Sequence, residues 1–380
     1  MSVYAALAYV LIFCACVVRV WSFPVITTDY TYFVAKWFVT LQENPGLTAF
    51  LHPFADYAPA YLYILKILTW FPVYSLLSVK IVTFVCDAAL GYVVYKLLKA
   101  TTTYLHEQRL LASAIVFAAP SFLINSSLWG QSDVLYTLPI LLSFFALLLE
   151  LPLFAVIWFG VALSVKLQAV FFLPILIGFL WHRRRLYELV LVPLIYMAFA
   201  VPALVGGAAS SDVLMVYLHQ SGEYTSLNVS SQSLFAFTDG VQLTSQVQAV
   251  LFWCGISVAL LVALLGAWLV THAKKPYEYV HSALVVALLL PFFLPRMHER
   301  YFYLADLFAL LYAFYQPRQW FVPLVVIGAS LLAYMPFLSG QVAIFAPITI
   351  DLRVPATMLG IVGVYLVARS ASQWRLHAVP

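Results

Sequence analysis

The densest group of side chains that could do chemistry lies in one short stretch, residues 295–301. It reads Pro-Arg-Met-His-Glu-Arg-Tyr and separates two long apolar runs. Four of these seven residues can be charged, whereas charged residues make up only 9% of the chain. Arg296, His298 and Arg300 are donors of the kind that bind phosphate. Glu299 could accept a hydrogen bond from a hydroxyl. An ordinary polar loop is the alternative interpretation.

Two acidic residues lie early in the chain, where a carboxylate could act as a base. Asp29 follows the first apolar run and could deprotonate a hydroxyl or hold a cation. Asp56 is followed by Tyr57, Ala58 and Pro59. Because proline favours the first turn of a helix, Asp56 could equally be a helix cap, and Asp29 allows the same interpretation.

A second polar motif combines groups that recognise sugars. It consists of Trp129, Gly130, Gln131, Ser132 and Asp133. An aromatic platform, a flexible glycine, an amide and a carboxylate together suit a hydroxyl-rich ligand. A tryptophan at a membrane interface is also common, so an anchor in the interface remains the alternative.

One lysine stands between two apolar runs. Lys166 is followed by Leu167 and Gln168, and the flanking segments are strongly hydrophobic. A lysine in such a place needs an anionic partner. A carboxylate of the protein would satisfy it, and so would a phosphate.

The composition identifies the environment of these motifs. Of 380 residues, 64% are hydrophobic, and the mean hydropathy is +0.98. Soluble domains are nearer 45–50% apolar, so we predict an all-α polytopic membrane protein. The four cysteines lie in apolar runs without the spacing of metal ligands.

We expect a single transmembrane domain, residues 1–380, with about 12 spans. A first outer loop, residues 27–72, should carry interfacial helices, and a polar outer loop covers residues 206–246. The segment 60–71 is too short to cross, so we interpret it as interfacial or re-entrant. The predicted spans cover residues 5–23, 76–98, 110–124, 135–149, 153–165, 170–180, 186–205, 247–270, 280–294, 301–315, 320–337 and 355–367.

The distribution of basic residues supports this arrangement. With a cytoplasmic N-terminus, the predicted inner loops and tail hold eleven of the 19 lysines and arginines, as the positive-inside rule requires. The same arrangement places Asp29, Asp56, Asp133, Lys166 and residues 296–300 on the outer face. The eleven basic residues are Lys96, Lys99, Arg109, Arg183, Arg184, Arg185, Lys274, Lys275, Arg318, Arg369 and Arg375.

These motifs, in this order, resemble the GT-C superfamily of integral-membrane glycosyltransferases, and the GT-C fold is implied. The chain is most similar to bacterial mannosyltransferases related to the PIG-V type GPI mannosyltransferase. It also resembles the dolichyl-phosphate-glucose glucosyltransferases. Two departures are Ala58, where these families commonly have proline, and the lone Asp29, where some carry a pair of acids. The matching residues are Asp29-Tyr30 with Trp37, Asp56-Tyr57-Ala58-Pro59, Trp129 to Asp133, Lys166-Leu167-Gln168 and Met297 to Phe302.

The resemblance implies an inverting hexosyltransferase that uses a polyprenyl-phosphate sugar, with mannose favoured and glucose next. Asp29 matches the acidic residue of the first outer loop that serves as the catalytic base. The expected donor-phosphate ligands are Lys166, Arg296, His298 and Arg300. The expected sugar or acceptor ligands are Asp56, Tyr57, Trp129, Gln131, Asp133, Gln168 and Glu299.

We expect no cofactor, while the lone acid at Asp29 leaves dependence on a divalent metal open. The expected partners are the lipid-linked donor, a membrane-anchored acceptor and the bilayer, with no nucleic acid. The expected location is a bacterial cytoplasmic membrane with the site on the outer face, or alternatively the endoplasmic reticulum. A transporter or flippase of lipid-linked sugars and a non-enzymatic scaffold are the rival classes. We find no internal repeat of the kind that transporters show.

Overall fold

The computed structural model describes residues 2–341 and 347–378, without the side chains of Ser221 and residues 373–378. The chain divides into two compact units. Unit 1 comprises Met1–Val170, Tyr187–Glu223 and Gln341–Ile344, and unit 2 comprises Phe171–Leu186, Tyr224–Gly340 and Phe345–Pro380.

Unit 1 is built from helices, several of which begin at a proline. Proline fits the first helical position because its missing N–H has no partner there. The α-helices are α1 Val3–Ser22, α2 Ala35–Glu43, α3 Pro59–Leu68, α4 Ser75–Thr101, α5 His106–Ala118, α6 Pro120–Leu123, α7 Asp133–Leu148, α8 Pro152–Val165, α10 Leu191–Val205, α11 Ser210–Leu214 and α12 Val216–Gly222. The shorter turns are η1 Tyr30–Val34, η2 Thr48–Phe50 and η3 Ile124–Trp129, while η4 Leu167–Phe172 and η5 Leu186–Val190 each include residues of both units.

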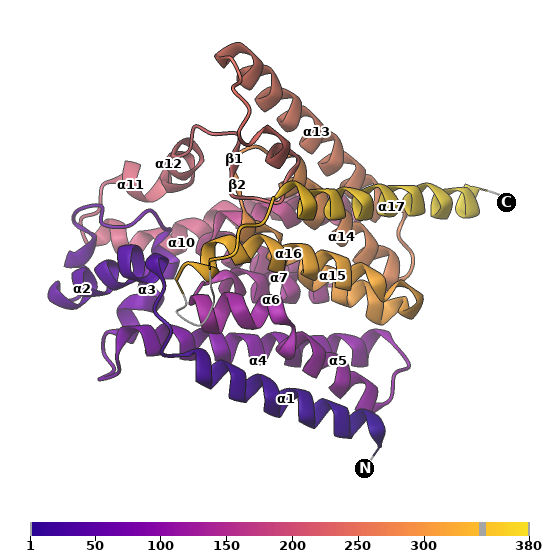
Figure 1. The fold of residues 1–380 in the computed structure, drawn as a ribbon, viewed down its shortest axis with the longest axis horizontal. Helices are drawn as coiled ribbons and strands as arrows, with labels where there is room; N and C mark the ends of the chain where they lie inside the picture. The colour runs from indigo at the N-terminus through magenta and orange to yellow at the C-terminus, as the bar shows by residue number, and fades with distance from the viewer. Residues whose placement is uncertain (1, 342–346, 379–380) are drawn as a thin grey trace. The chain divides into compact units, whose positions relative to one another are not determined.

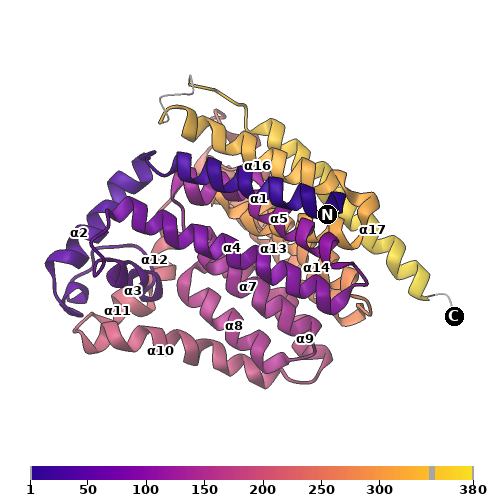
Figure 2. The same ribbon diagram turned by 90° about the horizontal axis from the view of Figure 1, so that it is seen from below.

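The long helices of unit 1 pack in a continuous series. Helix α5 contacts α1 and α4, α4 contacts α7, α7 contacts α8, and α8 contacts α10 (Figures 1 and 2). Within this series α7 and α8 form a tight hairpin whose turn contains Glu150 in the left-handed conformation, with φ of 58°. The hairpin brings the start of α7 level with the end of α8.

The predicted first outer loop folds into a small helical layer. Helices α2 and α3 pack together, and their buried side chains join a core that also includes residues of α10 and α11. Its largest members are Trp37, Phe50 and Tyr61. Helix α3 has only 10 residues, or about 15 Å, against about 30 Å of hydrocarbon. It is therefore too short to span, as predicted.

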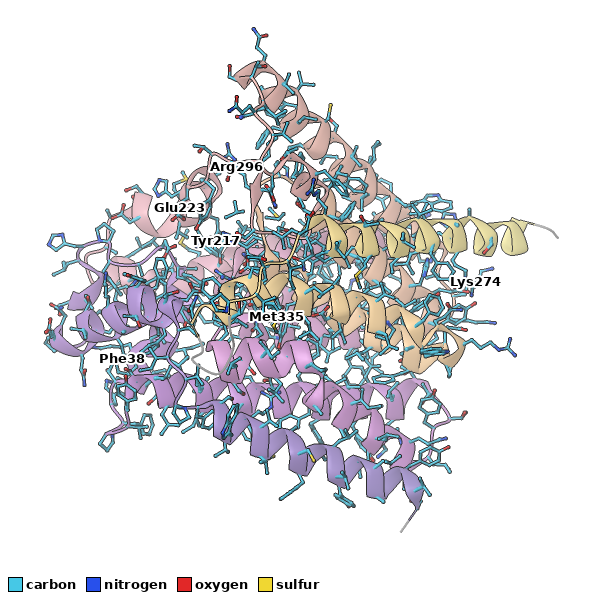
Figure 3. All side chains as sticks on the ribbon, in the orientation of Figure 1. Phe38, Tyr217, Glu223, Lys274, Arg296 and Met335 are labelled. Carbon is cyan, nitrogen blue, oxygen red and sulfur yellow. The ribbon has the colours of Figure 1, made fainter. Side chains whose placement is uncertain are left out.

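Unit 2 is centred on a helix that is buried on all sides. Helix α14 contacts α9, α13, α15 and α17, and such a helix belongs in the interior of a membrane bundle. Lys274 lies in the turn that joins α13 to α14 (Figure 3). The elements are α9 Leu173–His182, β1 Asn228–Val229, η6 Leu234–Thr238, α13 Ser245–His272, α14 Pro276–Phe293, β2 Met297–His298, η7 Glu299–Phe302, α15 Tyr303–Tyr315, η8 Pro317–Gln319, α16 Phe321–Ser339 and α17 Arg353–Ala378.

Among the described residues, seven helices are long and apolar enough to cross a membrane. An eighth results if two segments bent by 45° at Ala119, His106–Ala118 and Pro120–Trp129, form one span. Shorter apolar helices occupy most of the other predicted spans. The all-α polytopic class is thereby confirmed, whereas the number of about 12 spans and the single domain stay predictions. The predicted cytoplasmic tail includes Arg375, whose side chain lies outside the described part.

Candidate functional site

The α7–α8 hairpin positions an ion pair inside unit 1. Asp133 begins α7 and Lys166 directly follows α8, so the two meet at the open end of the hairpin. The Nζ atom of Lys166 lies 2.5 Å from Oδ1 of Asp133, and both side chains are at most 5% exposed. Of the two kinds of anion that the sequence allows for Lys166, the structure shows a carboxylate of the protein. Breaking such a buried pair is costly, because it leaves one charge uncompensated.

Asp133 is held from a second side. Its Oδ2 atom accepts a hydrogen bond of 2.8 Å from the buried amide of Asn125. The ammonium of Lys166 also lies 5.8 Å from the ring centre of Tyr57 and 5.9 Å from that of Tyr136. The aromatic rings stabilise the cation by their quadrupoles and shield the pair from solvent.

A second polar group of unit 1 contains Asp29. Its Oδ2 atom accepts hydrogen bonds from Nε1 of Trp129 at 3.1 Å and from Nε2 of Gln131 at 2.6 Å. The hydroxyl of Thr27 donates to the carbonyl of Trp129 at 3.0 Å, and this bond connects the segment before Asp29 to the segment before Gln131. The structure therefore brings the predicted base against the aromatic-amide motif and orients its half-buried carboxylate.

The local backbone explains how both Trp129 and Gln131 reach the same carboxylate. Gly130 between them has φ of +79°, a left-handed conformation that side-chain-bearing residues rarely adopt. It ends the π-helical turn η3, and a second π-helical turn, η1, starts directly after Asp29. Such turns are rare and often occur at functional sites. The backbone N–H of Gln131 donates to the carbonyl of Asn125 at 2.9 Å, which joins the two polar groups.

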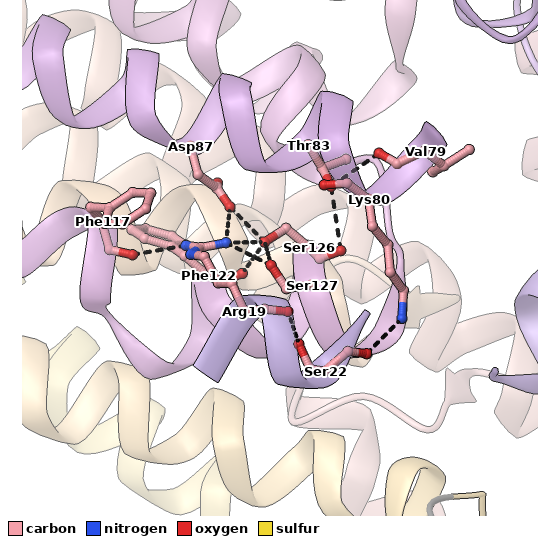
Figure 4. A network of polar contacts seen from close by, with 10 residues as sticks. All are labelled: Arg19, Ser22, Val79, Lys80, Thr83, Asp87, Phe117, Phe122, Ser126 and Ser127. Carbon is pink, nitrogen blue, oxygen red and sulfur yellow. Dashed lines mark hydrogen bonds and ion pairs between the residues drawn. The ribbon is translucent and has the colours of Figure 1, made fainter. Parts of the chain in front are cut away.

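A buried network on the neighbouring spans supports η3 (Figure 4). The guanidinium of Arg19 donates to Asp87 at 2.6 Å and to the hydroxyls of Ser126 and Ser127 at 2.7 and 2.9 Å. Those three hydrogen bonds come from Nη1 of Arg19, and its Nη2 atom donates to the carbonyl of Phe117 at 2.8 Å. Because Ser126 and Ser127 belong to η3, this network fixes the turn that presents Trp129.

Lys80 extends this support toward Asp29. Its ammonium donates to the carbonyls of Ser22, Val25 and Leu128 at 3.1, 2.7 and 3.1 Å. The first two carbonyls belong to the segment that leads from α1 to Asp29, and the third precedes Trp129. Lys80 thus connects the two stretches of backbone that carry the Asp29 contact.

The structure does not support the interpretation of Asp29 as a helix cap. Asp29 makes no capping hydrogen bond to η1, and the cap position of α3 is Ala58, also without a side-chain bond. The carbonyl of Asp56 instead accepts from the side chain of Gln220, and Asp56 lines a cavity of unit 1. Gln168 is buried in η4, and its Oε1 atom accepts no hydrogen bond from the described chain.

In unit 2, the polar stretch 295–301 is bound by the loop that precedes α13. Strand β2 pairs in parallel with β1, so that Met297 lies opposite Asn228 (Figure 1). Arg296 has φ of 63° and donates its N–H to the carbonyl of Leu227 at 2.8 Å. The left-handed backbone conformation is unfavourable for a residue with a side chain. It persists where the contacts of the surrounding structure hold the backbone in place.

The side chains of this stretch are arranged around a buried carboxylate. Glu299 lies 3.9 Å from Nδ1 of His298 and 3.7 Å from Nη1 of Arg300. The ring of His298 packs edge-to-face on Tyr224 and Tyr301, at 4.8 and 5.2 Å between centres. These contacts give unit 2 a cluster of one guanidinium, one imidazole and a carboxylate.

The second guanidinium of the stretch packs on an aromatic ring. The guanidinium of Arg296 lies 4.9 Å from the ring centre of Phe252, a cation–π distance. The amide of Gln232 donates to the carbonyl of Glu299 at 3.0 Å and joins the polar outer loop to this stretch.

Several supporting residues were not found from the sequence. Asn125 has the clearest signal, because it opens the polar triplet Asn-Ser-Ser after an apolar run. Arg19, Lys80 and Asp87 are single charges inside long apolar runs, a recognised mark of function or pairing in membrane helices. In the part of the chain that the structure covers, no group of three or more His, Cys, Asp or Glu side chains is arranged to hold a metal.

The helices of spanning length define a polytopic membrane protein. Its buried ion pairs and polar loop motifs form a polar site within the helical units. The sequence model of glycosyltransferase family 87 matches residues 54–295, well over half of the chain, and the protein belongs to this family. It is a GT-C-like family of membrane glycosyltransferases. Comparison with curated proteins finds no match.

The family match covers some site residues and leaves others outside. Asp56, Asp133 and Lys166 lie within it, whereas Asp29 precedes it and Arg296 directly follows its end. The match confirms the class that the motifs indicated, a membrane glycosyltransferase. The closer kinship with PIG-V type mannosyltransferases or with dolichyl-phosphate-glucose glucosyltransferases stays a prediction.

Proposed function

We propose that the protein is an inverting glycosyltransferase that moves a hexose from a polyprenyl-phosphate donor to a membrane-associated glycolipid or glycan. Mannose is the favoured sugar and glucose the next. The reaction takes place on the outer face of the membrane, in bacteria the cytoplasmic membrane. The observation that carries the proposal is the contact of Asp29 with Trp129 and Gln131 in a chain of family 87.

Asp29 acts in this reaction as the base. It takes the proton of the acceptor hydroxyl while the acceptor oxygen forms a bond to the anomeric carbon. The bond from that carbon to the phosphate oxygen breaks, and the lipid phosphate leaves with the bonding electrons. One base and one displacement invert the anomeric centre, whereas retaining glycosidases use two carboxylates about 5–5.5 Å apart.

The leaving phosphate needs positive charge more than it needs a proton, because it is already a good leaving group. Lys166 of unit 1 is one candidate for this role. Arg296, His298 and Arg300 of unit 2 are the others. The buried pairing of Lys166 with Asp133 fixes the direction of its ammonium, as preorganised stabilisation requires.

Two buried amides support sugar binding next to the Asp133–Lys166 pair. The Oδ1 atom of Asn125 and the Oε1 atom of Gln168 accept no hydrogen bond from the described residues. A buried acceptor without a donor costs about 1–3 kcal/mol. Hydroxyls of a bound sugar would supply such donors, and Asp56 and Asp133 would orient others.

The test is a turnover assay with the purified protein in lipid nanodiscs. Short-chain polyprenyl-phosphate mannose and glucose serve as donors, and octyl α-mannoside serves as acceptor. We expect a new glycoside whose anomeric configuration, read by NMR, is opposite to that of the donor. A flippase would instead move labelled donor across a vesicle membrane and form no glycoside, which would overturn the proposal.

A further inference from the structure

Unit 1 contains a cavity of about 860 Å³ that is separate from the hydrogen bonds of Asp29. It lies between the first outer loop, which contributes η1, α2 and residues 53–56, and the segment of α11 and α12. Its volume falls within the range of about 300–1,000 Å³ that is typical of small-ligand pockets. Both walls come from segments predicted to lie outside the membrane.

The walls of the cavity combine aromatic rings with carboxylates. Tyr32 and Trp37 line one side; Tyr32 is 62% exposed and Trp37 is buried, and the ammonium of Lys36 lies 5.5 Å from the centre of the Tyr32 ring. Asp56 and Glu223 are among the acidic side chains (Figure 3 shows Glu223 at the end of α12). Aromatic faces pack on the C–H surface of a sugar, and carboxylates accept hydrogen bonds from its hydroxyls.

The charges of the cavity favour a neutral ligand over an anion. Among the described residues that line the cavity, the basic side chains that accompany Asp56, Asp212 and Glu223 are Lys36 and His219. A phosphate would meet a net negative wall. The described carboxylates are not gathered as metal ligands either. Burial raises the pKa of Glu223, and the charge of Asp56 adds to this effect.

One layer of aromatic rings separates the cavity from the buried ion pair. Trp37 lines the cavity, and its ring lies 5.3 Å from that of Tyr57, between centres. Tyr57 in turn lies 5.8 Å from the ammonium of Lys166. A ligand in the cavity is therefore separated from the Asp133–Lys166 pair by the rings of Trp37 and Tyr57.

We infer that this cavity binds the carbohydrate part of the acceptor, a neutral oligosaccharide of two or three hexoses. The exposed ring of Tyr32 packs on a sugar ring, the buried Trp37 forms the floor beside it, and Asp56 and Glu223 accept hydrogen bonds from the sugar hydroxyls. The inference rests on the proposed function, because it assigns a place to the second substrate of that reaction. It adds Tyr32, Asp212, His219 and Glu223, for which the motifs predicted no role.

The experiment measures binding without turnover. Full-length protein in nanodiscs is titrated with mannotriose and with maltotriose, by saturation-transfer NMR. Tyr32→Ala and Glu223→Gln should each weaken binding of the preferred trisaccharide at least tenfold and raise KM for octyl mannoside by a similar factor. The matched controls are Tyr9→Ala, an exposed tyrosine of α1, and Glu43→Gln at the end of α2, and both should bind as the wild type does.

The outcomes separate this inference from the proposed function. If neither trisaccharide binds the wild type, or if binding is unchanged in Tyr32→Ala and Glu223→Gln, the cavity is not the acceptor site and the transfer reaction still stands. If the two variants lose binding but the wild type transfers no hexose, the cavity is a carbohydrate site and the proposed reaction is overturned.

Discussion

The carboxylate of Asp29 accepts a hydrogen bond of 2.6 Å from the amide of Gln131, which lies 102 residues later in the chain. The indole of Trp129 donates to the same oxygen. This contact joins the segment between α1 and η1 to the segment between η3 and α7. The carboxylate of Asp29 is therefore oriented by residues distant in the chain. It makes no capping hydrogen bond to the helix that follows it.

The Arg19–Asp87 pair should be essential for the stability of unit 1. Arg19→Met leaves the buried carboxylate of Asp87 without its guanidinium, and losing one partner of a buried pair costs about 3–5 kcal/mol. We expect a large fall in the apparent unfolding temperature, measured in detergent. Lys99→Ala removes an exposed cation of α4 and should change it little. Equal effects of the two changes would contradict the assigned role of the network.

Some of these contacts follow from the sequence and others do not. Because Lys166 lies between apolar runs, the sequence predicts that it has an anionic partner. The turn between α7 and α8 places Asp133 opposite Lys166. The sequence also predicts that Asp29 and Asp133 lie on one membrane face, and this stays a prediction. The sequence could not show that Gln131 reaches Asp29, because this contact depends on the left-handed Gly130 and on a π-helical turn. Neither feature can be predicted from the periodicity of hydrophobic residues.

The supporting ions were missed for a related reason. Arg19 and Asp87 are 68 residues apart, and each lies in an apolar run whose mean hydropathy hides a single charge. Their pairing exists only when α1, α4 and η3 are packed. In the same way, the pairing of β1 with β2 joins a polar loop to the 295–301 stretch, although α13 and α14 lie between them in the chain, and no local pattern predicts it.

Donor binding should depend on the cations assigned to the phosphate. Arg300→Ala should weaken binding of short-chain polyprenyl-phosphate mannose more than tenfold, or about 1.4 kcal/mol, because the anion loses a charge-assisted partner. Calorimetric titration measures this, with the exposed Arg318→Ala as control. If Arg296→Ala, Arg300→Ala and Lys166→Ala all keep the affinity of the wild type, the phosphate binds elsewhere.

The predicted topology can be tested with single cysteines. In a chain whose four cysteines are replaced, Arg184→Cys should be labelled from the cytoplasmic side and Ser230→Cys from the outer side. Both positions are exposed in their units, so access does not depend on unfolding. A membrane-impermeant maleimide applied to intact cells and to inverted vesicles gives the answer. Labelling of both from one side would show that the number of spans between them is even.

Glu223 should make the stability of the protein depend on pH. Burial, helped by Asp56, raises the pKa of Glu223, whereas a glutamate in the unfolded chain ionises at about 4.3. The folded state therefore holds this proton more tightly. The resulting stabilisation is present below pH 4.3 and is lost as the pH rises through the raised pKa.

Glu223→Gln removes this titration and leaves Asp56, Asp212, Lys36 and His219 in place. The unfolding temperature of the variant relative to the wild type should therefore rise from pH 4 toward neutrality. Scanning calorimetry or a thermal shift assay measures the difference between the two unfolding temperatures. A difference that stays constant over this range would mean that Glu223 has an ordinary pKa.

The role of Asp29 is tested most directly by turnover of Asp29→Asn, which keeps the size and hydrogen bonding of the side chain and removes its basicity. We predict a loss of 10²–10⁴ in rate, or about 3–5 kcal/mol, with donor binding retained. Asp56→Asn should lose less, through positioning alone. The competing bases are Glu299 and Asp133. Normal turnover of Asp29→Asn, with activity lost in Glu299→Gln or Asp133→Asn, would contradict the assignment of Asp29 as the base.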